Sequence, residues 1–477
     1  NLAKVEVASS NLVSRSNLFT LTWQKFKFNI YFMIRILSLL IISLSLFING
    51  AEDKFNAFIV VDKVQLDSKI HIGIKDNIDV KGMATTAGSI ALSNNYPQYD
   101  AFLISKLKSS NYHIYGKTNL SEWANFRSFK SVSGWSSKGG QTINPYGKNR
   151  NPCGSSSGSA VAVASGILDV AIGTETNGSI SCPASVNGIV GMKPSVGLVS
   201  RSGIVPISST QDTAGPMGNS VMIVAKTLKV IAGKDPLDEL TNNIPDNFDF
   251  NFTENLNSNA LNKKRFGLLK SGSDDEEGQR LLNKIISVIK SKGGEVIEIE
   301  DNRVYPGEDE FFLLLYEFER DLKLYLADTS LPYKDLEDLI AFNKANKDLV
   351  MPYFKQEIFE ASIEASLDHD KYLEVLTKLE QVKIDFDALL EKYDLDAFVG
   401  LTRNPAWIID YEVGDGGAME AQRSWGNGGY AAIAGYPHIT IPLGEVESLP
   451  VGVSFIGTKW SDKSLLEYAA SFEKANQ

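Results

Sequence analysis

Two serines, Ser155 and Ser179, lie in a block of small residues that extends from position 151 to position 203. The block is rich in Gly and Ser but contains apolar runs such as residues 160–164, so it differs from a flexible linker. Small side chains let backbone segments approach closely, and they let hydroxyl and backbone N–H groups surround a reacting atom. The block therefore predicts a catalytic centre that uses serine.

Three common motifs do not account for this block. The run 116–118 (Gly-Lys-Thr) would end a phosphate-binding loop, but Asn111 stands where that loop needs glycine. The run 154–158 fits a nucleophile elbow centred on Ser156, yet residues 144–152 are too polar for the buried strand that must precede it. The four His residues are too far apart to predict a metal site.

A serine nucleophile needs a general base, and no histidine is an evident candidate. Lysine can serve when burial lowers its pKa by about 3 units, toward neutrality. Lys75 is the candidate because it ends an apolar run, residues 70–74, that should be buried. By itself this local pattern favours a solvated surface lysine, so the assignment depends on the wider set of motifs.

Taken together and in order, several motifs resemble the amidase signature family. They are the runs 75–77 (Lys-Asp-Asn), 116–119 (Gly-Lys-Thr-Asn), 154–159 (Gly-Ser-Ser-Ser-Gly-Ser), 173–180 (Gly-Thr-Glu-Thr-Asn-Gly-Ser-Ile), 183–184 (Pro-Ala) and 191–194 (Gly-Met-Lys-Pro). Finer matches at residues 119–127, 152–157 and 208–216 resemble the peptide amidase branch, whose members remove ammonia from C-terminal peptide amides.

The resemblance implies a triad of Lys75, Ser155 and Ser179. Ser179 would be the nucleophile, Ser155 a bridging serine after a cis peptide bond, and Lys75 a neutral base that acts through Ser155. The oxyanion hole would consist of backbone N–H groups from the Ser179 loop, namely those of Thr176, Asn177, Gly178 and Ser179. No metal or organic cofactor is implied, and the expected substrate is a small amide or a peptide amide.

The sequence also makes predictions for residues outside the triad. Arg403, Asn404 and Trp407 are expected to line the substrate pocket on the acyl side, although a structural role fits Trp407 equally well. Cys153 and Cys182 are too few for a disulfide scaffold, and one bridge between them is possible but not implied. Cys182 is expected to be a buried, inert thiol.

The chain also departs from the broader family pattern. Glu175 and Asn177 stand where Asp and Gly are common, and Ser181 stands where Arg is usual. The missing Arg argues against the A-type subunit of a tRNA-dependent amidotransferase, which is one alternative function. A catalytically silent binding protein is another, because only residues 52–62 precede the strand that leads to Lys75.

The first 51 residues are predicted to lie outside the catalytic domain. No Met precedes Met33, so residues 1–32 are expected to be a non-native upstream segment. Residues 33–51 have the layout of a signal peptide, and the apolar run 36–48 is shorter than a membrane span of about 20 residues. A periplasmic or secreted protein without stable membrane insertion is expected, with a cytoplasmic location as the alternative. The net charge of −11 disfavours nucleic acid as a partner.

The remaining chain, residues 52–477, is predicted to be one amidase domain of the α/β class, with a central mixed β-sheet flanked by helices. Apolar runs at residues 266–269, 296–299, 397–401, 439–441 and 451–455 predict strands, while residues 277–292, 464–474 and most of 308–369 predict helices. Residues 121–127 are expected to be helical. The segment 235–259, rich in Asn and Asp, predicts a surface connection between two halves.

Overall fold

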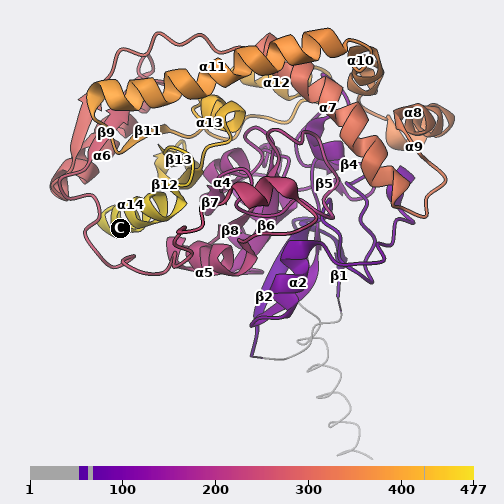
Figure 1. Cartoon of the computed structure of the whole chain (residues 1–477), viewed down its shortest axis with the longest axis horizontal. Coiled ribbons are helices and arrows are strands. Elements are labelled where there is room, and N and C mark those ends of the chain that lie inside the picture. The colour runs from indigo at the N-terminus through magenta and orange to yellow at the C-terminus, as the bar shows by residue number, and fades with distance from the viewer. Residues whose placement is uncertain (1–52, 63–67, 424) are drawn as a thin grey trace, which may run out of the picture. The chain divides into compact units, whose positions relative to one another are not determined.

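A computed structural model describes residues 53–62, 68–423 and 425–477 of the chain. Within these residues, eleven strands form one mixed sheet in the order β1-β3-β2-β6-β8-β7-β12-β13-β11-β9-β10, and helices cover both of its faces (Figure 1). The predicted single α/β domain with a large mixed sheet is therefore confirmed. The expected upstream segment (1–32) and signal peptide (33–51) lie outside the described residues.

The sheet divides between the two halves of the chain. The first half supplies β1 (Phe58–Val61), β2 (Ile70–Lys75), β3 (Tyr112–Thr118), β6 (Val170–Glu175), β7 (Val190–Lys193) and β8 (Thr213–Gly218). The second half supplies β9 (Arg265–Leu268), β10 (Glu295–Glu298), β11 (Ala397–Leu401), β12 (His438–Val446) and β13 (Leu449–Ile456). Antiparallel pairing of β7 with β12 joins the halves, while β4 (Trp135–Ser136) and β5 (Gly140–Gln141) form a separate small hairpin.

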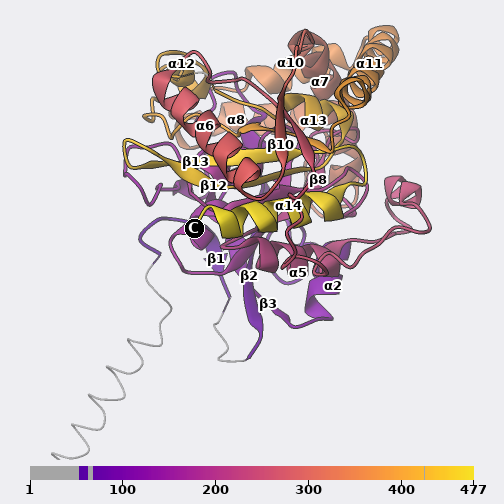
Figure 2. The same ribbon diagram turned by 90° about the vertical axis from the view of Figure 1, so that its left-hand side faces the viewer.

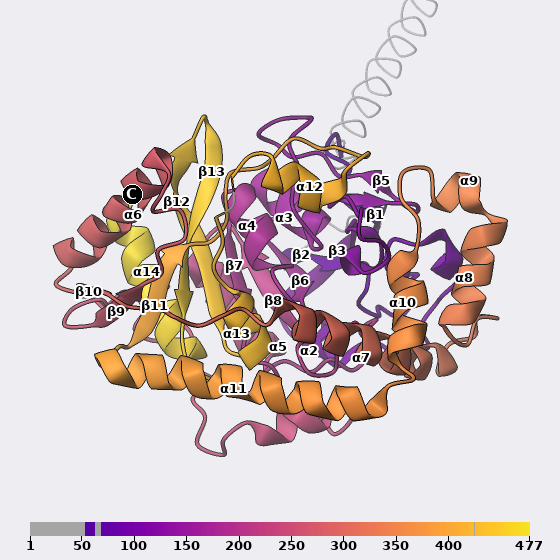
Figure 3. The same cartoon turned by 90° about the horizontal axis from the view of Figure 1, so that it is seen from above.

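The helices form layers on the two faces of the sheet. One face is covered by α2 (Phe102–Lys108), α5 (Val221–Ile231), α6 (Glu276–Ser291) and α14 (Asp462–Ala475). The other is covered by α3 (Ser157–Ala164), α4 (Ser181–Val186), α11 (His369–Tyr393) and α13 (Gly429–Ala434), with α7 (Gly307–Ala327) packed against α11. Figure 2 shows α14 below the sheet and α11 above it. The remaining helices are α8 (Leu336–Ala345), α9 (Lys347–Val350), α10 (Glu357–Ala365) and α12 (Gly414–Glu420). Figure 3 shows α8, α9 and α10 together at one end of the molecule.

Apolar periodicity explains why these helices pack on the sheet. Helix α6 buries Leu281, Leu282, Ile285 and Ile289, which recur on one helical face. Its N-terminus is capped by Asp275, whose carboxylate accepts the backbone N–H groups of Glu277 and Gly278. The buried side of α6 joins the largest apolar core, which also contains side chains of α5 and α14.

One local prediction is wrong. Residues 121–127 do not form an α-helix, because the short 3₁₀ segment Glu122–Asn125 contains Trp123 and Ala124 with φ values of 52° and 54°. These left-handed conformations end any regular helix. Within the described residues, no helix combines the length and the apolar character that a bilayer span requires.

Candidate active site

Lys75 is the last residue of β2, and its side chain is fully buried. Its Nζ donates to the Ser155 hydroxyl at 2.7 Å. It also donates to Oγ1 and to the carbonyl oxygen of Thr174, at 2.8 and 3.2 Å. Thr174 lies in β6, which pairs with β2 in parallel, so the sheet holds the amine against its acceptors.

Burial of the Lys75 amine shifts its pKa and therefore the fraction of it that is charged. Removal from water lowers the pKa of Lys75 from 10.5 to about 7, because the ammonium form loses its hydration. The carboxylates of Asp212 and Glu175 raise this pKa, but their effect is smaller than that of desolvation. A substantial fraction of Lys75 is therefore neutral near pH 7, as a general base must be.

Ser155 lies in the loop that precedes α3. The peptide bond between Gly154 and Ser155 is cis, as the resemblance implies. A side chain at position 154 would collide with the Ser121 hydroxyl, so this position requires glycine. The Ser121 backbone N–H donates to the Ser155 carbonyl at 3.1 Å, which ties the Ser155 loop to its surroundings.

The next residue joins the Ser155 loop to the Ser179 loop. The backbone N–H of Ser156 donates to the Ser179 carbonyl at 3.2 Å, and the Ser156 hydroxyl donates to the Thr174 carbonyl at 3.0 Å. Both serine loops are thus held at the end of β6. The structure brings Lys75 and Ser155 into direct contact, whereas no hydrogen bond connects the Ser155 and Ser179 hydroxyls among the described residues.

Ser179 lies in the loop between β6 and α4. The Glu175 carboxylate, at the end of β6, accepts hydrogen bonds from the backbone N–H groups of Ile180 and Ser181 at 2.7 and 2.8 Å. These bonds anchor the C-terminal end of the Ser179 loop to β6. Gly178 has a φ of 84°, a conformation that glycine adopts without strain. The backbone N–H groups of Asn177, Gly178 and Ser179 donate to no other residue in the described part of the chain, so they remain available to an oxyanion.

A polar network connects the Ser179 loop to α7. The Asn177 side-chain amide donates to the Tyr305 hydroxyl and to Glu310 Oε1, both at 2.8 Å. Gln211 donates to the same Glu310 oxygen at 2.8 Å, and the Tyr305 hydroxyl donates to Oε2. Burial raises the pKa of Glu310 above its ordinary value. Sequence reasoning missed Tyr305 and Glu310, because they lie 128 and 133 residues from Asn177 and no local motif marks them.

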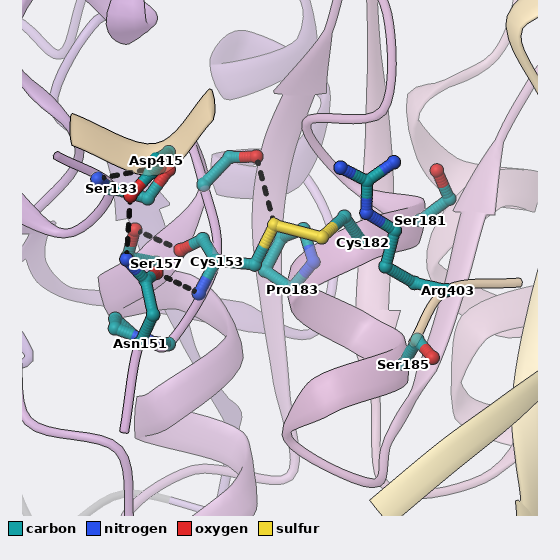
Figure 4. Close-up of a disulfide and its surroundings, with 12 residues drawn as sticks. Ser133, Asn151, Cys153, Ser157, Ser181, Cys182, Pro183, Ser185, Arg403 and Asp415 are labelled. Atoms are coloured by element: carbon teal, nitrogen blue, oxygen red, sulfur yellow. Dashed lines mark hydrogen bonds between the residues drawn. A yellow bond between two sulfur atoms is a disulfide. The ribbon is translucent and has the colours of Figure 1, made fainter. Parts of the chain in front are cut away.

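The two cysteines form a disulfide. Cys153 and Cys182 have Cα atoms 6.0 Å apart and are bonded through sulfur (Figure 4). The prediction that Cys182 is an inert thiol is therefore wrong, because the fold brings Cys153, in the loop before α3, next to Cys182 in α4, although the two are 29 positions apart in the sequence. Since Cys153 precedes Ser155 by two positions and Cys182 follows Ser179 by three, the bridge links the two serine loops covalently.

A cleft of about 500 Å³ opens beside the Ser179 loop. Its lining residues are Asn177, Gly178, Ser181 and Cys182 from the first half of the chain, and Leu269, Asp301, Arg303, Tyr305, Phe386, Phe398, Thr402, Arg403, residues 425–430 and Ile456 from the second. A second cavity of about 310 Å³ reaches Asn77, Thr174 and Thr176. A cleft of the larger size can hold a small molecule or a short peptide end.

The three predicted pocket residues occupy different places. Arg403 lines the cleft. Asn404 is buried and borders a separate depression near Arg150. Trp407 packs against the disulfide and donates its indole N–H to Asp415 at 3.4 Å. Of these three residues, Arg403 alone shares a cavity with the Ser179 loop.

Comparison with known families decides the classification. The family model described as amidase matches residues 68–466, which include both serine loops and β2. The chain belongs to the amidase family. Its members hydrolyse amides, so this amidase is an amide-hydrolysing enzyme.

Individual relatives support the same classification. A probable amidase of Arabidopsis thaliana is 37% identical over 418 residues, covering 84% of this chain and 75% of that protein. The native peptide amidase from Stenotrophomonas maltophilia is similar in structure, with a TM-score of 0.82 and 39% identity over 89% of each chain. The A-type subunit of the glutamyl-tRNA(Gln) amidotransferase from Thermotoga maritima has a TM-score of 0.71 at 25% identity, covering 91% of this chain and 90% of its own.

Metal-ligating side chains are not grouped in the described part of this amidase. Among those residues, no three His, Cys, Asp or Glu side chains lie close enough together to hold an ion. His438, for example, is buried against Ser454 at 2.7 Å, and burial lowers its pKa to about 4. The ionisable group that the structure places against Ser155 is Lys75, at 2.7 Å.

Proposed function

We propose that this amidase hydrolyses a carboxamide to a carboxylate and ammonia through an acyl-enzyme on Ser179. The observation that carries the proposal is the buried Lys75 amine, which has a pKa of about 7 and contacts the Ser155 hydroxyl at 2.7 Å. A neutral amine in this position can accept a proton from one serine while that serine accepts a proton from another.

In the first half-reaction, Ser179 Oγ attacks the amide carbonyl carbon. The Ser179 proton passes to Ser155 Oγ, and the Ser155 proton passes to Lys75 Nζ. The oxyanion accepts hydrogen bonds from the unpaired backbone N–H groups of the Ser179 loop, each of which contributes about 3–4 kcal/mol to stabilising the transition state. Collapse of the tetrahedral intermediate breaks the C–N bond, and the proton returns through Ser155 to the nitrogen, which leaves as ammonia.

The second half-reaction repeats the pattern with water. Water attacks the acyl carbon, loses its proton through Ser155 to Lys75, and forms a second tetrahedral intermediate. Breaking of the bond to Ser179 releases the carboxylic acid, and the Lys75 proton returns to Ser179 Oγ. The enzyme is regenerated, and the net reaction consumes one water for each ammonia released.

A peptide with a C-terminal amide is the proposed substrate class. Similarity to a structure described as a peptide amidase, at 39% identity, supports it. The volume of the cleft, about 500 Å³, is also compatible with the end of a peptide chain. The disulfide supports a periplasmic or secreted location, because such bonds persist in oxidising compartments. N-terminal sequencing of the protein from its host tests export, and a chain that starts before residue 33 would contradict it.

Ammonia release from an N-acetylated dipeptide amide tests the proposed reaction. We expect Ser179→Ala to lower kcat at least a thousandfold (about the scale seen when serine hydrolases lose their nucleophile), whereas Ser165→Ala in the same block should retain activity. Absence of ammonia from any carboxamide with the wild-type protein would refute the proposal, and so would unchanged activity of Ser179→Ala.

Membership of an amidotransferase complex is the second candidate function, supported by the structural similarity to the A-type subunit from Thermotoga maritima. It predicts that amide hydrolysis depends on partner proteins and tRNA. Turnover of simple amides by the isolated chain would favour the hydrolase. Strict dependence on a partner would favour the amidotransferase.

A further inference from the structure

Arg403 brings a positive charge to the cleft wall, and no carboxylate of the described residues forms a hydrogen bond or an ion pair with it. It follows β11 and lines the same cleft as Asn177 and Gly178. One of its terminal nitrogens donates to the Met419 sulfur at 2.7 Å, and its Nε makes no hydrogen bond among the described residues. A thioether is a weak acceptor, so most of the hydrogen-bonding capacity of this guanidinium is unused.

The other charges of the cleft do not neutralise Arg403. Asp301 forms an ion pair with Arg303 at 2.7 Å, and the Arg303 guanidinium stacks over the Tyr430 ring at 4.2 Å. These two charges therefore cancel, and the lining residues retain one excess positive charge, that of Arg403.

Asp415 is the carboxylate whose field acts on Arg403, but its oxygens are already used. It accepts the Ser133 backbone N–H at 2.9 Å and the Asn151 side-chain amide at 2.7 Å, on different oxygens. Figure 4 shows Asp415 on the far side of the disulfide from Arg403. A ligand in the cleft can therefore reach the guanidinium without competing with a protein carboxylate for it.

The guanidinium is held in place by backbone. Arg403 and Gly426 pair as an isolated antiparallel bridge, and a Cβ atom at Gly426 would lie 3.2 Å from Arg403 Nη1. Close backbone approach thus limits the movement of the side chain. Figure 4 shows the guanidinium beside Ser181 and Cys182, which follow the nucleophile in the sequence.

We propose that Arg403 binds a carboxylate of the substrate, so that this amidase prefers amides whose acyl group is acidic, such as peptides that end in glutamate or aspartate amide. The inference rests on the proposed function: because ammonia is the leaving group, the rest of the substrate lies on the acyl side. A partly buried guanidinium without a carboxylate partner is unfavourable, and its planar set of N–H donors matches the two oxygens of a carboxylate. The ligand carboxylate supplies the missing partner.

The test compares N-acetyl-glutamate α-amide with N-acetyl-methionine amide, which is similar in length but uncharged. We expect kcat/KM to be about ten- to a hundredfold higher for the acidic amide, the range expected for a charge-assisted hydrogen bond. Arg403→Met should abolish this preference, so that the variant hydrolyses the acidic and the neutral amide with equal kcat/KM. Arg403→Lys keeps the positive charge but loses the planar guanidinium, so it should retain part of the preference for the acidic amide. Thermal melting checks that both variants fold.

Equilibrium binding to Ser179→Ala provides the same comparison without turnover. Tighter binding of the acidic amide, lost in the double variant Ser179→Ala/Arg403→Met, would support the inference. Equal affinities of Ser179→Ala for the two amides would overturn it, as would an Arg403→Met variant that loses both activities equally. Failure of the proposed function is a different result, because no amide would then release ammonia from the wild-type protein.

Discussion

Replacing Lys75 with methionine should remove a pH dependence from the stability of the protein. The pKa of Lys75 is about 7 in the folded chain and 10.5 as a free side chain. Between these values the unfolded state binds more protons than the folded state, so the free energy of unfolding rises with pH in this window. The penalty for burying the amine is fully present below pH 7 and disappears as the pH approaches 10.5. For these two pKa values, linkage gives a gain of about 2 kcal/mol between pH 7 and pH 9.

Urea unfolding at pH 6, 7, 8 and 9 measures this effect. The substitution also deletes hydrogen bonds to Ser155 and Thr174, but their loss shifts the stability difference by a constant amount at every pH. Wild type minus Lys75→Met should therefore be nearly flat below pH 7 and should grow by about 2 kcal/mol up to pH 9. Lys193→Met is the matched control, because Lys193 is also fully buried, with its pKa lowered to about 8.

The control separates burial from catalysis. Lys193→Met should show a smaller pH-dependent difference and should retain amidase activity, whereas Lys75→Met should lose it. Parallel stability curves for wild type and Lys75→Met from pH 7 to pH 9 would refute a buried neutral amine at this position. Wild-type turnover by Lys75→Met would refute its role as the base.

Three further predictions follow from the same geometry. Wild-type kcat should fall about tenfold per pH unit below pH 7, since only neutral Lys75 accepts a proton, and a flat profile from pH 5 to 8 in ammonia-release assays would contradict this. Glu310→Gln should lower kcat about tenfold with KM little changed, because it disturbs the acceptor that orients Asn177, and an effect on KM alone would argue against that positioning role. Replacing both Cys153 and Cys182 with alanine should lower the free energy of unfolding by about 3–4 kcal/mol, because the bridge closes a loop between residues 29 positions apart, and an unchanged urea midpoint would exclude this.

The fold class could be predicted because its signals are local. The apolar face of α6 is visible as a spacing of three and four residues, and the predicted helix 277–292 differs from the observed Glu276–Ser291 by one residue at each end. The predicted helix at 121–127 failed because its sequence does not reveal the left-handed φ values of Trp123 and Ala124. Such conformations depend on tertiary contacts, including the packing of Trp123 against Phe359 at 5.5 Å.

In the active site, too, features with a local sequence signal could be predicted, and features that depend on tertiary contacts could not. Lys75 alone resembled a surface lysine, and only its order relative to the serine motifs suggested a base, which the structure places 2.7 Å from Ser155. Tyr305 and Glu310 could not be predicted, because a hydrogen bond across 128 or 133 positions has no local pattern. The disulfide could not be predicted either, since two cysteines far apart in a sequence carry no information about their separation in space.

The order of strands in the sheet has a consequence for how the enzyme can be assembled. Within the described eleven-stranded sheet, the strands that precede residue 235 end at β7 and the strands that follow residue 259 begin at β12, so the β7–β12 pair is where the two halves meet. A backbone cut inside 245–259 would therefore break no strand, and each fragment would keep a contiguous half of the sheet. Such fragments are suited to split-protein complementation. The serines and Lys75 would come from one fragment and Arg403 with Tyr305 from the other, so turnover would report their reassociation.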